Sequence, residues 1–220
     1  MSCGIYLDDP RGGYTCEACR LRIAWIREPY CRCCGAPFYG KLAEEGACPV
    51  CTGQRPAFEQ CRSLFLFEAT GARIVHALKY EDGLWLRDEI ALLLREEGTW
   101  EAYFGDACIV PVPLHRKKHR RRGFNQAAVI AAAIQQAFPS TKVSDCLVRV
   151  RKTPTQTFLS REERIRNTHG AFKRVHEPAS GRRIVVVDDV LTTGATLSAA
   201  VTALGEGSEG RISAFTLAHG

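Results

Sequence analysis

Two groups of residues in this sequence could do chemistry: cysteine pairs near the N-terminus and adjacent aspartates near the C-terminus. Six of the 11 Cys form C-x-x-C pairs, namely Cys16 and Cys19, Cys31 and Cys34, and Cys48 and Cys51. Paired thiolates on tight turns are typical ligands of structural zinc, which takes four of them at about 2.3 Å. Few apolar residues separate these cysteines, and zinc binding, on the order of 10 kcal/mol, would help such a segment to fold. We predict a zinc domain in residues 1–60.

The pairing of the zinc ligands stays open at this point. Six paired cysteines are too many for one tetrahedral site and too few for two, so Cys3, Cys33 or Cys61 could complete a second set. Reduced core cysteines, a disulfide scaffold and a redox pair are the alternatives, and three closely spaced pairs favour zinc over each of them. Cys108 and Cys146 lie in apolar stretches and are expected in the core.

The aspartate pair follows an apolar run in "IVVVDDVLTTGATL", residues 184–197. Loop amides and a helix start after Asp188 and Asp189 favour a phosphate. The expected phosphate loop comprises Leu191, Thr192, Thr193, Gly194, Ala195 and Thr196. Two carboxylates would repel a phosphate unless they accept hydrogen bonds from sugar hydroxyls or lie near Mg²⁺. A ribose 5-phosphate meets both conditions.

Three other interpretations of this stretch are a receiver domain, a P-loop and an ordinary strand with a polar turn. A receiver domain needs a further aspartate about fifty residues on, but only 31 residues follow Asp189. A P-loop needs a lysine after its last glycine, and none follows Gly194. A strand with an ordinary polar turn accounts for the aspartates alone but not for the whole string.

The elements that must position these residues alternate after residue 61. Apolar runs predict strands at 62–69, 107–113, 142–150, 182–189 and 211–219, and helical periodicity predicts helices at 71–80, 84–97, 125–138 and 195–204. This alternation is typical of an α/β fold with a mainly parallel sheet and flanking helices. Ligands of such sheets bind beyond the carboxyl ends of the strands, where Asp188 and Asp189 are expected.

The N-terminus has neither the basic start nor the apolar stretch of a secretion signal, and no run reaches the roughly 20 apolar residues of a membrane span. We expect a cytoplasmic protein with no membrane span.

Several motifs together resemble the ComF family, with its double zinc ribbon and type I phosphoribosyltransferase-like domain. "VVVDDVLTTGATL" resembles the phosphoribosyl pyrophosphate loop of these transferases, and "HALKY" (76–80), "VPVPLH" (110–115), "RRGFNQA" (121–127) and the segment 151–172 resemble the ComF branch. The likeness spans almost the whole chain.

The resemblance implies a zinc ribbon domain, 1–60, and a type I phosphoribosyltransferase-like domain, 61–220. It places Asp188 and Asp189 at ribose hydroxyls, 192–196 at the 5-phosphate, and the segment after "VPVP", with Arg121 and Arg122, near pyrophosphate. It implies Zn²⁺, Mg²⁺ and phosphoribosyl pyrophosphate as ligands, and a role in natural competence with the DNA-uptake machinery at the inner membrane as a possible partner.

One departure from the family pattern concerns Cys3. Family members carry four C-x-x-C pairs, whereas the first pair is here reduced to Cys3, thirteen positions before Cys16. We expect a first zinc site of Cys3, Cys16 and Cys19 that is one ligand short, with a native start upstream of Met1. The set 31, 34, 48 and 51 then forms the complete second site.

Positive charge is concentrated in the middle of the chain. Residues 111–174 hold 15 Lys and Arg against three Asp and Glu, whereas the whole chain has a net charge of +6. "HRKKHRRR" (115–122) holds much of it, and Arg116, Lys117, Lys118 and Arg120 are expected to contact single-stranded DNA. The alternative is a pyrophosphate pocket or a solvated loop. Phe124 and Phe158 alone interleave this basic stretch, so the sequence does not support base stacking.

The polar segment 151–172 is expected to be a lid over the ligand, with Gln156, Arg161, Arg164 and Asn167 as residues to test. An ordinary loop with a short helix at 160–167 is the alternative. Two functions therefore remain: a DNA-handling competence protein that binds a phosphoribosyl ligand, and an active phosphoribosyltransferase with an unidentified acceptor.

Overall fold

The structure is a computed structural model that describes residues 13–38, 46–81, 83–151, 161–179, 181–205 and 212–220. Five parallel strands form the central sheet in the order β1-β7-β6-β2-β3. Their bounds are β1 (Cys61–Leu66), β2 (Cys108–Pro111), β3 (Lys142–Val143), β6 (Ile184–Leu191) and β7 (Ile212–His219). The mainly parallel α/β sheet that the alternation predicts is confirmed.

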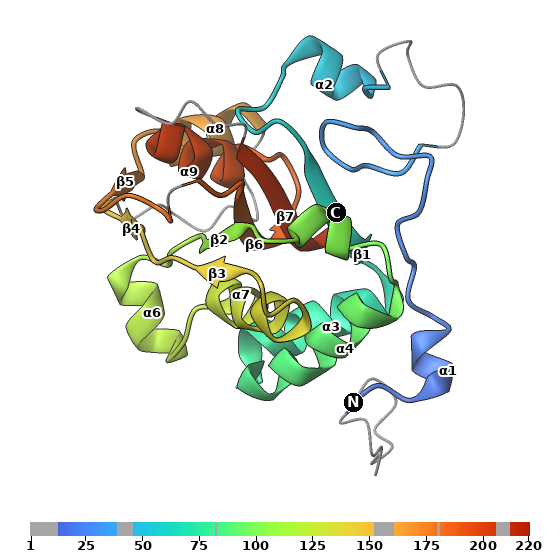
Figure 1. The fold of residues 1–220 in the computed structure, drawn as a ribbon. Helices are drawn as coiled ribbons and strands as arrows, with labels where there is room; N and C mark the ends of the chain where they lie inside the picture. The colour runs from blue at the N-terminus through green and yellow to red at the C-terminus, as the bar shows by residue number, and fades with distance from the viewer. Residues whose placement is uncertain (1–12, 39–45, 82, 152–160, 180, 206–211) are drawn as a thin grey trace.

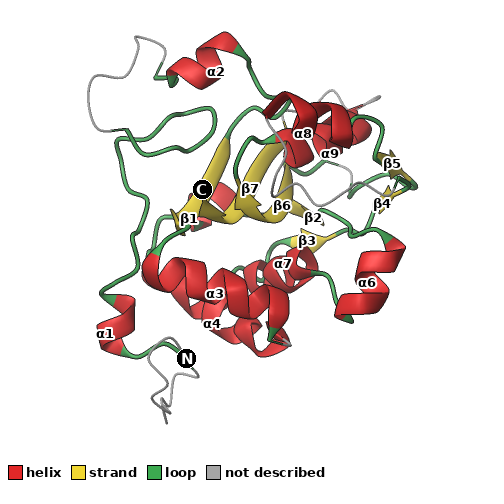
Figure 2. Cartoon of the chain, turned by 180° about the vertical axis from the view of Figure 1, so that it is seen from behind, coloured by secondary structure: helices red, strands yellow, loops and turns green. Residues whose placement is uncertain are grey.

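Helices cover both faces of this sheet (Figures 1 and 2). One face carries α3 (Ala69–Tyr80), α4 (Leu86–Glu96) and α7 (Gln126–Ala137), and the other carries α9 (Ala195–Gly205) with α8 (Arg161–Thr168) beside it. Shorter helices are η1 (Gly83–Trp85), α5 (Glu101–Phe104) and α6 (Arg116–Arg122). The basic run, which sequence reasoning left without a secondary structure, is therefore helical in α6.

Strand β6 shows why the apolar run near the C-terminus is buried. Its side chains alternate between the faces, so that Val185 and Val187 join the core under α3, α4 and α7, while Ile184 and Val186 join the core under α9. A strand that is buried on both sides reads as a continuous apolar run. The polar residues begin at Asp188, where the strand becomes partly exposed before it ends at the buried Leu191.

The strand order reverses between β2 and β6. The chain passes from β2 to β3 on one side of this point and from β6 to β7 on the other. Loops that leave two neighbouring strands in opposite directions open a crevice at the carboxyl ends of those strands. The segment after β2 and the aspartate pair of β6 therefore face one crevice.

The expected strand at 142–150 is split in two. Only Lys142–Val143 belongs to the main sheet, whereas β4 (Leu147–Arg149) pairs antiparallel with β5 (Phe172–Arg174) in a separate small sheet. β-propensity reports a half-buried strand but not its partner, so the sequence pattern could not separate the two. The split matters for the site because it moves Arg149 away from the edge of the main sheet.

The N-terminal segment contains α1 (Glu17–Arg20) and α2 (Pro49–Gly53). Between them the chain runs along the edge of β1, where Leu66 N–H donates to the Ala24 carbonyl at 2.8 Å and Ile26 N–H to that of Leu64 at 3.2 Å. These bonds occupy an otherwise open sheet edge. The boundary near residue 60 stays a prediction. In the part of the chain that the structure describes, no helix is long and apolar enough to cross a membrane.

Candidate functional site

Four cysteines of the N-terminal segment form a metal site. The Sγ atoms of Cys31, Cys34, Cys48 and Cys51 all lie within 4.8 Å of one another, and those of Cys34 and Cys48 are 3.8 Å apart. Tetrahedral thiolates with Zn–S bonds of about 2.3 Å stand about 3.8 Å apart, so these residues fit zinc. The structure thus brings together the four cysteines of the complete second site that the family pattern implies, whereas the spacing alone left the pairing open.

The thiols of this cluster influence one another electrostatically. Burial, together with the neighbouring Cys31 and Cys48, raises the pKa of the Cys34 thiol to about 12, because thiolates repel one another. Bound zinc reverses this balance by holding the thiols deprotonated. The backbone N–H of Cys48 also donates to the Cys31 sulfur at 3.2 Å, which fixes one ligand.

Among the described residues, no cysteine besides these four belongs to the group of potential metal ligands. Cys16 and Cys19 belong to the α1 region, which lies far from α2 in both views (Figures 1 and 2), and Cys3 lies outside the described residues. The Cys33 carbonyl accepts a hydrogen bond from the Cys61 N–H at 2.7 Å, so the cysteine cluster is hydrogen-bonded to the start of β1. The incomplete first site stays a prediction.

We expect Cys48→Ser to release one equivalent of zinc per chain, because three thiolates bind structural zinc far more weakly than four. Metal analysis after dialysis measures the loss. Cys146→Ser, a buried cysteine of the other core, is the matched control and should release none. Equal zinc contents of Cys48→Ser and the unmodified protein would contradict the assignment.

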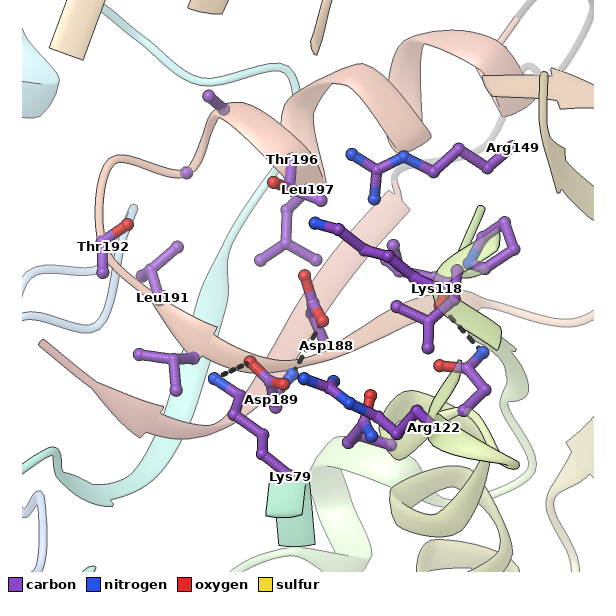
Figure 3. Close-up of a pocket in the computed structure, with 18 of the residues that line it drawn as sticks. Lys79, Lys118, Arg122, Arg149, Asp188, Asp189, Leu191, Thr192, Thr196 and Leu197 are labelled. Atoms are coloured by element: carbon purple, nitrogen blue, oxygen red, sulfur yellow. Dashed lines mark hydrogen bonds and ion pairs between the residues drawn. The ribbon is translucent and has the colours of Figure 1, made fainter. Parts of the chain in front are cut away.

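The second site is a cavity of about 440 Å³ at the point where the strand order reverses (Figure 3). Its walls come from the end of β6 and the loop that follows, from the segment after β2 with α6 and the start of α7, and from the end of α3. Arg149 of β4 adds one further side chain. Most of the polar residues expected from the sequence therefore meet in one place.

The aspartate pair lies at the centre of this cavity. Asp188 Oδ1 accepts a hydrogen bond from the Asp189 N–H at 2.9 Å, and Asp189 Oδ1 lies 3.0 Å from Lys79 Nζ. Burial and, after it, the Asp189 charge raise the pKa of Asp188, which is about 7 although the Asp189 N–H, Lys79 and Arg149 oppose the shift. The two carboxylates thus differ, since Asp189 forms an ion pair with Lys79 and Asp188 has a raised pKa.

The loop after β6 is shaped for close approach to an anion. Gly194 has φ +73°, a conformation that favours glycine, and its carbonyl accepts from the Ser198 N–H at 2.8 Å within the first turn of α9. A Cβ at Gly194 would stand 3.5 Å from Phe58 Cζ. The buried ring of Phe58 therefore lies next to this loop. Phe58 follows the four zinc-binding cysteines in the chain, so their segment reaches the loop.

Three cations face the carboxylates from the opposite wall. Lys118, Arg122 and Arg149 point toward Asp188 and Asp189 in Figure 3. Burial lowers the pKa of Lys118, and the charges of Arg149, Arg122 and Arg121 lower it further. Crowded cations of this kind stabilise an anionic ligand that separates them.

The structure sorts the basic residues differently from the sequence analysis. Arg121 and Arg122 line the cavity as expected, but so does Lys118, which the sequence analysis placed on an outward nucleic-acid face. Arg116, Lys117 and Arg120 are exposed. The difference arises because residues three and four apart share one side of a helix, so that 118, 121 and 122 face together.

Sequence reasoning missed several residues of the cavity, of which four are polar residues with groups that could contact a ligand. Lys79 and Tyr80 come from "HALKY", which carried a resemblance but no role, and Arg149 comes from a strand whose partner could not be predicted. Gln126, 2% exposed, also lines the cavity, and its Nε2 has no hydrogen-bond partner among the described residues. Its place after the N-cap residue Asn125 was the available signal.

The expected lid is only partly described. Gln156 lies outside the described residues, and Arg161 and Arg164 belong to α8. Asn167 is half-buried, and its carbonyl accepts a hydrogen bond from Arg151 at 2.8 Å. The short helix of the alternative interpretation is present, and a lid function stays a prediction.

We expect Asp188→Asn to stabilise the protein more at pH 8 than at pH 5. The raised pKa means that Asp188 keeps a proton in the folded protein at pH values where the unfolded chain has released it. The contribution of this proton to the stability of the folded protein is complete below about pH 4 and is lost as pH rises through about 7. Asparagine does not ionise, and its advantage should grow by on the order of 2 kcal/mol between about pH 5 and pH 8.

Urea unfolding at the two pH values measures this difference. Asp106→Asn, which changes an exposed aspartate, is the control. An effect of Asp188→Asn that is the same at both pH values would show that the Asp188 carboxyl is not held near neutrality.

Fold and site together define an α/β protein with a charged cavity at the switch point of a parallel sheet and an N-terminal zinc ribbon. The double zinc ribbon domain family matches residues 1–57. The chain is 32% identical over 192 residues to the DNA utilization protein YhgH of Escherichia coli (strain K12), covering 83% of this chain and 80% of that protein.

Two further relatives carry competence names. Competence protein F of Haemophilus influenzae is 27% identical over 191 residues, covering 83% of this chain and 80% of the relative. Competence protein ComFC of Bacillus subtilis is 27% identical over 214 residues, covering 92% and 83%. The chain belongs to the ComF family.

Proposed function

We propose that this protein works in natural competence and DNA utilisation, binding a phosphoribosyl diphosphate ligand in the cavity and single-stranded DNA on the basic helix α6. The names of its relatives support the process. The observation that carries the ligand is the meeting of the 192–196 loop, two carboxylates and three cations in one cavity.

Each part of such a ligand has a matching group. Loop amides and the start of α9 suit the 5-phosphate, because backbone N–H groups and the helix dipole at a helix N-terminus favour an anion. The carboxylates of Asp188 and Asp189 suit ribose hydroxyls, which donate hydrogen bonds. Lys118, Arg122 and Arg149 suit the diphosphate, whose charge offsets their repulsion.

Mg²⁺ is compatible with these residues, since it binds through one or two carboxylates together with ligand phosphates. It would neutralise part of the diphosphate charge when bound. The side chains of the protein do the rest: Lys79 holds the Asp189 carboxylate in place at 3.0 Å, and Gln126 offers an amide donor.

Helix α6 supports the DNA half of the proposal. Six of its seven residues are Lys or Arg, and among the described residues no carboxylate forms an ion pair with any of them. Its exposed face carries Arg116, Lys117 and Arg120. Exposed cations without counter-charges suit the phosphates of nucleic acid.

We expect saturable binding of phosphoribosyl pyrophosphate with Mg²⁺, and at least a tenfold loss in Asp188→Asn/Asp189→Asn, because amides do not replace both acceptor carboxylates. Calorimetric titration measures it. Asp106→Asn/Asp145→Asn, which changes two exposed aspartates elsewhere, should bind like the unmodified protein. Failure of the folded, zinc-loaded protein to bind would overturn the ligand half.

We expect Arg116→Ala/Lys117→Ala/Arg120→Ala to weaken binding of a single-stranded oligonucleotide. Each lost phosphate contact should reduce the slope of log K against log salt by about 0.7, so the total change is about 2. Binding of phosphoribosyl pyrophosphate should not change, because these side chains lie outside the cavity lining.

Fluorescence anisotropy over a range of salt concentrations measures the slope. The matched control removes three exposed charges from other elements, Arg73, Arg87 and Lys142. The same slope in both triple variants would place the DNA elsewhere, and no DNA binding at low salt would overturn the DNA half.

A further inference from the structure

Helix α6 presents cations both to the cavity and to solvent. Lys118, Arg121 and Arg122 line the cavity, while Arg116, Lys117, Arg120 and also Arg121 are exposed. A helix with its side chains is about 10–12 Å across, and a single strand carries a phosphate about every 3.4 Å or more along its axis. A strand on the exposed face is therefore only a few nucleotides from the mouth of the cavity.

An exposed aromatic ring stands at that mouth. Tyr80, the last residue of α3, lines the cavity and is 65% exposed. The Arg122 guanidinium lies 5.4 Å from the centre of its ring, so Tyr80 is attached to α6 by a cation–π contact. Phe67, also in the cavity lining, is 45% exposed.

Aromatic rings beside a row of cations are the usual means by which proteins bind single strands. The cations hold the phosphates, and the rings stack on bases of any sequence. Arg122 adds a planar surface next to Tyr80 on which a base can also stack. Sequence spacing could not show this platform, because 42 positions separate Tyr80 from Arg122.

We propose that single-stranded DNA runs along α6 and crosses the mouth of the cavity, with one base stacked on Tyr80. This inference rests on the proposed DNA contact of α6, and it adds the path that the DNA strand takes from α6 to Tyr80. The strand and the phosphoribosyl ligand then both use Lys118, Arg121 and Arg122, so that binding of one opposes binding of the other.

The test is anisotropy of a fluorescein-labelled oligothymidine with Tyr80→Ala. Loss of one stacked base should weaken binding roughly 5- to 100-fold, while the salt slope stays unchanged because no charge is removed. Tyr80→Phe keeps the ring and should restore binding. Leu84→Ala, which truncates a neighbouring side chain that is 59% exposed and outside the cavity lining, should have no effect.

A second measurement follows the competition. Adding phosphoribosyl pyrophosphate with Mg²⁺ should raise the apparent Kd of the oligonucleotide for the unmodified protein. The inference is overturned if the protein binds DNA but Tyr80→Ala binds it equally well, or if the two ligands bind independently. No DNA binding by the unmodified protein at low salt would overturn the proposed DNA contact itself.

Discussion

The arrangement of the cavity depends on one electrostatic constraint, which is that two adjacent carboxylates lie at the end of a buried strand. Asp188 and Asp189 cannot both be charged there without nearby cations, and the pKa of Asp188 is accordingly raised. Lys79, Lys118, Arg122 and Arg149 supply those cations from α3, α6 and β4. Side chains from three separate elements around β6 thus lie where they can compensate these charges.

The zinc cluster performs for the N-terminal segment what a hydrophobic core performs for the rest. Residues 13–38 and 46–60 contribute few side chains to the main core, and Cys31, Cys34, Cys48 and Cys51 form a cluster of their own. The cluster also reaches the ligand loop, since the Cys33 carbonyl binds the Cys61 N–H and Phe58 lies against Gly194. Metal binding and loop geometry are therefore physically connected.

Helix α6 shows how the proposed DNA-binding surface and the proposed ligand cavity can share one domain. A run of six cations on an exposed strand would form a single surface, but a helix divides them into two sides. One side lines the cavity and the other is exposed to solvent. The two proposed binding activities would then be coupled through neighbouring residues of the same helix.

The sequence by itself determined the features that local pattern encodes. Strand and helix periodicity predicted the parallel sheet, the apolar run placed Asp188 and Asp189 near the end of a strand, and three C-x-x-C pairs predicted a zinc domain whose ligand pairing the spacing left open. Only the tertiary structure decided the partners of these residues. Lys79, Tyr80 and Arg149 reach the cavity through strand order and helix packing, which depend on long-range contacts that no local pattern records. The same reason explains why the expected strand at 142–150 is divided between two sheets and why the Lys118 side chain lines the cavity.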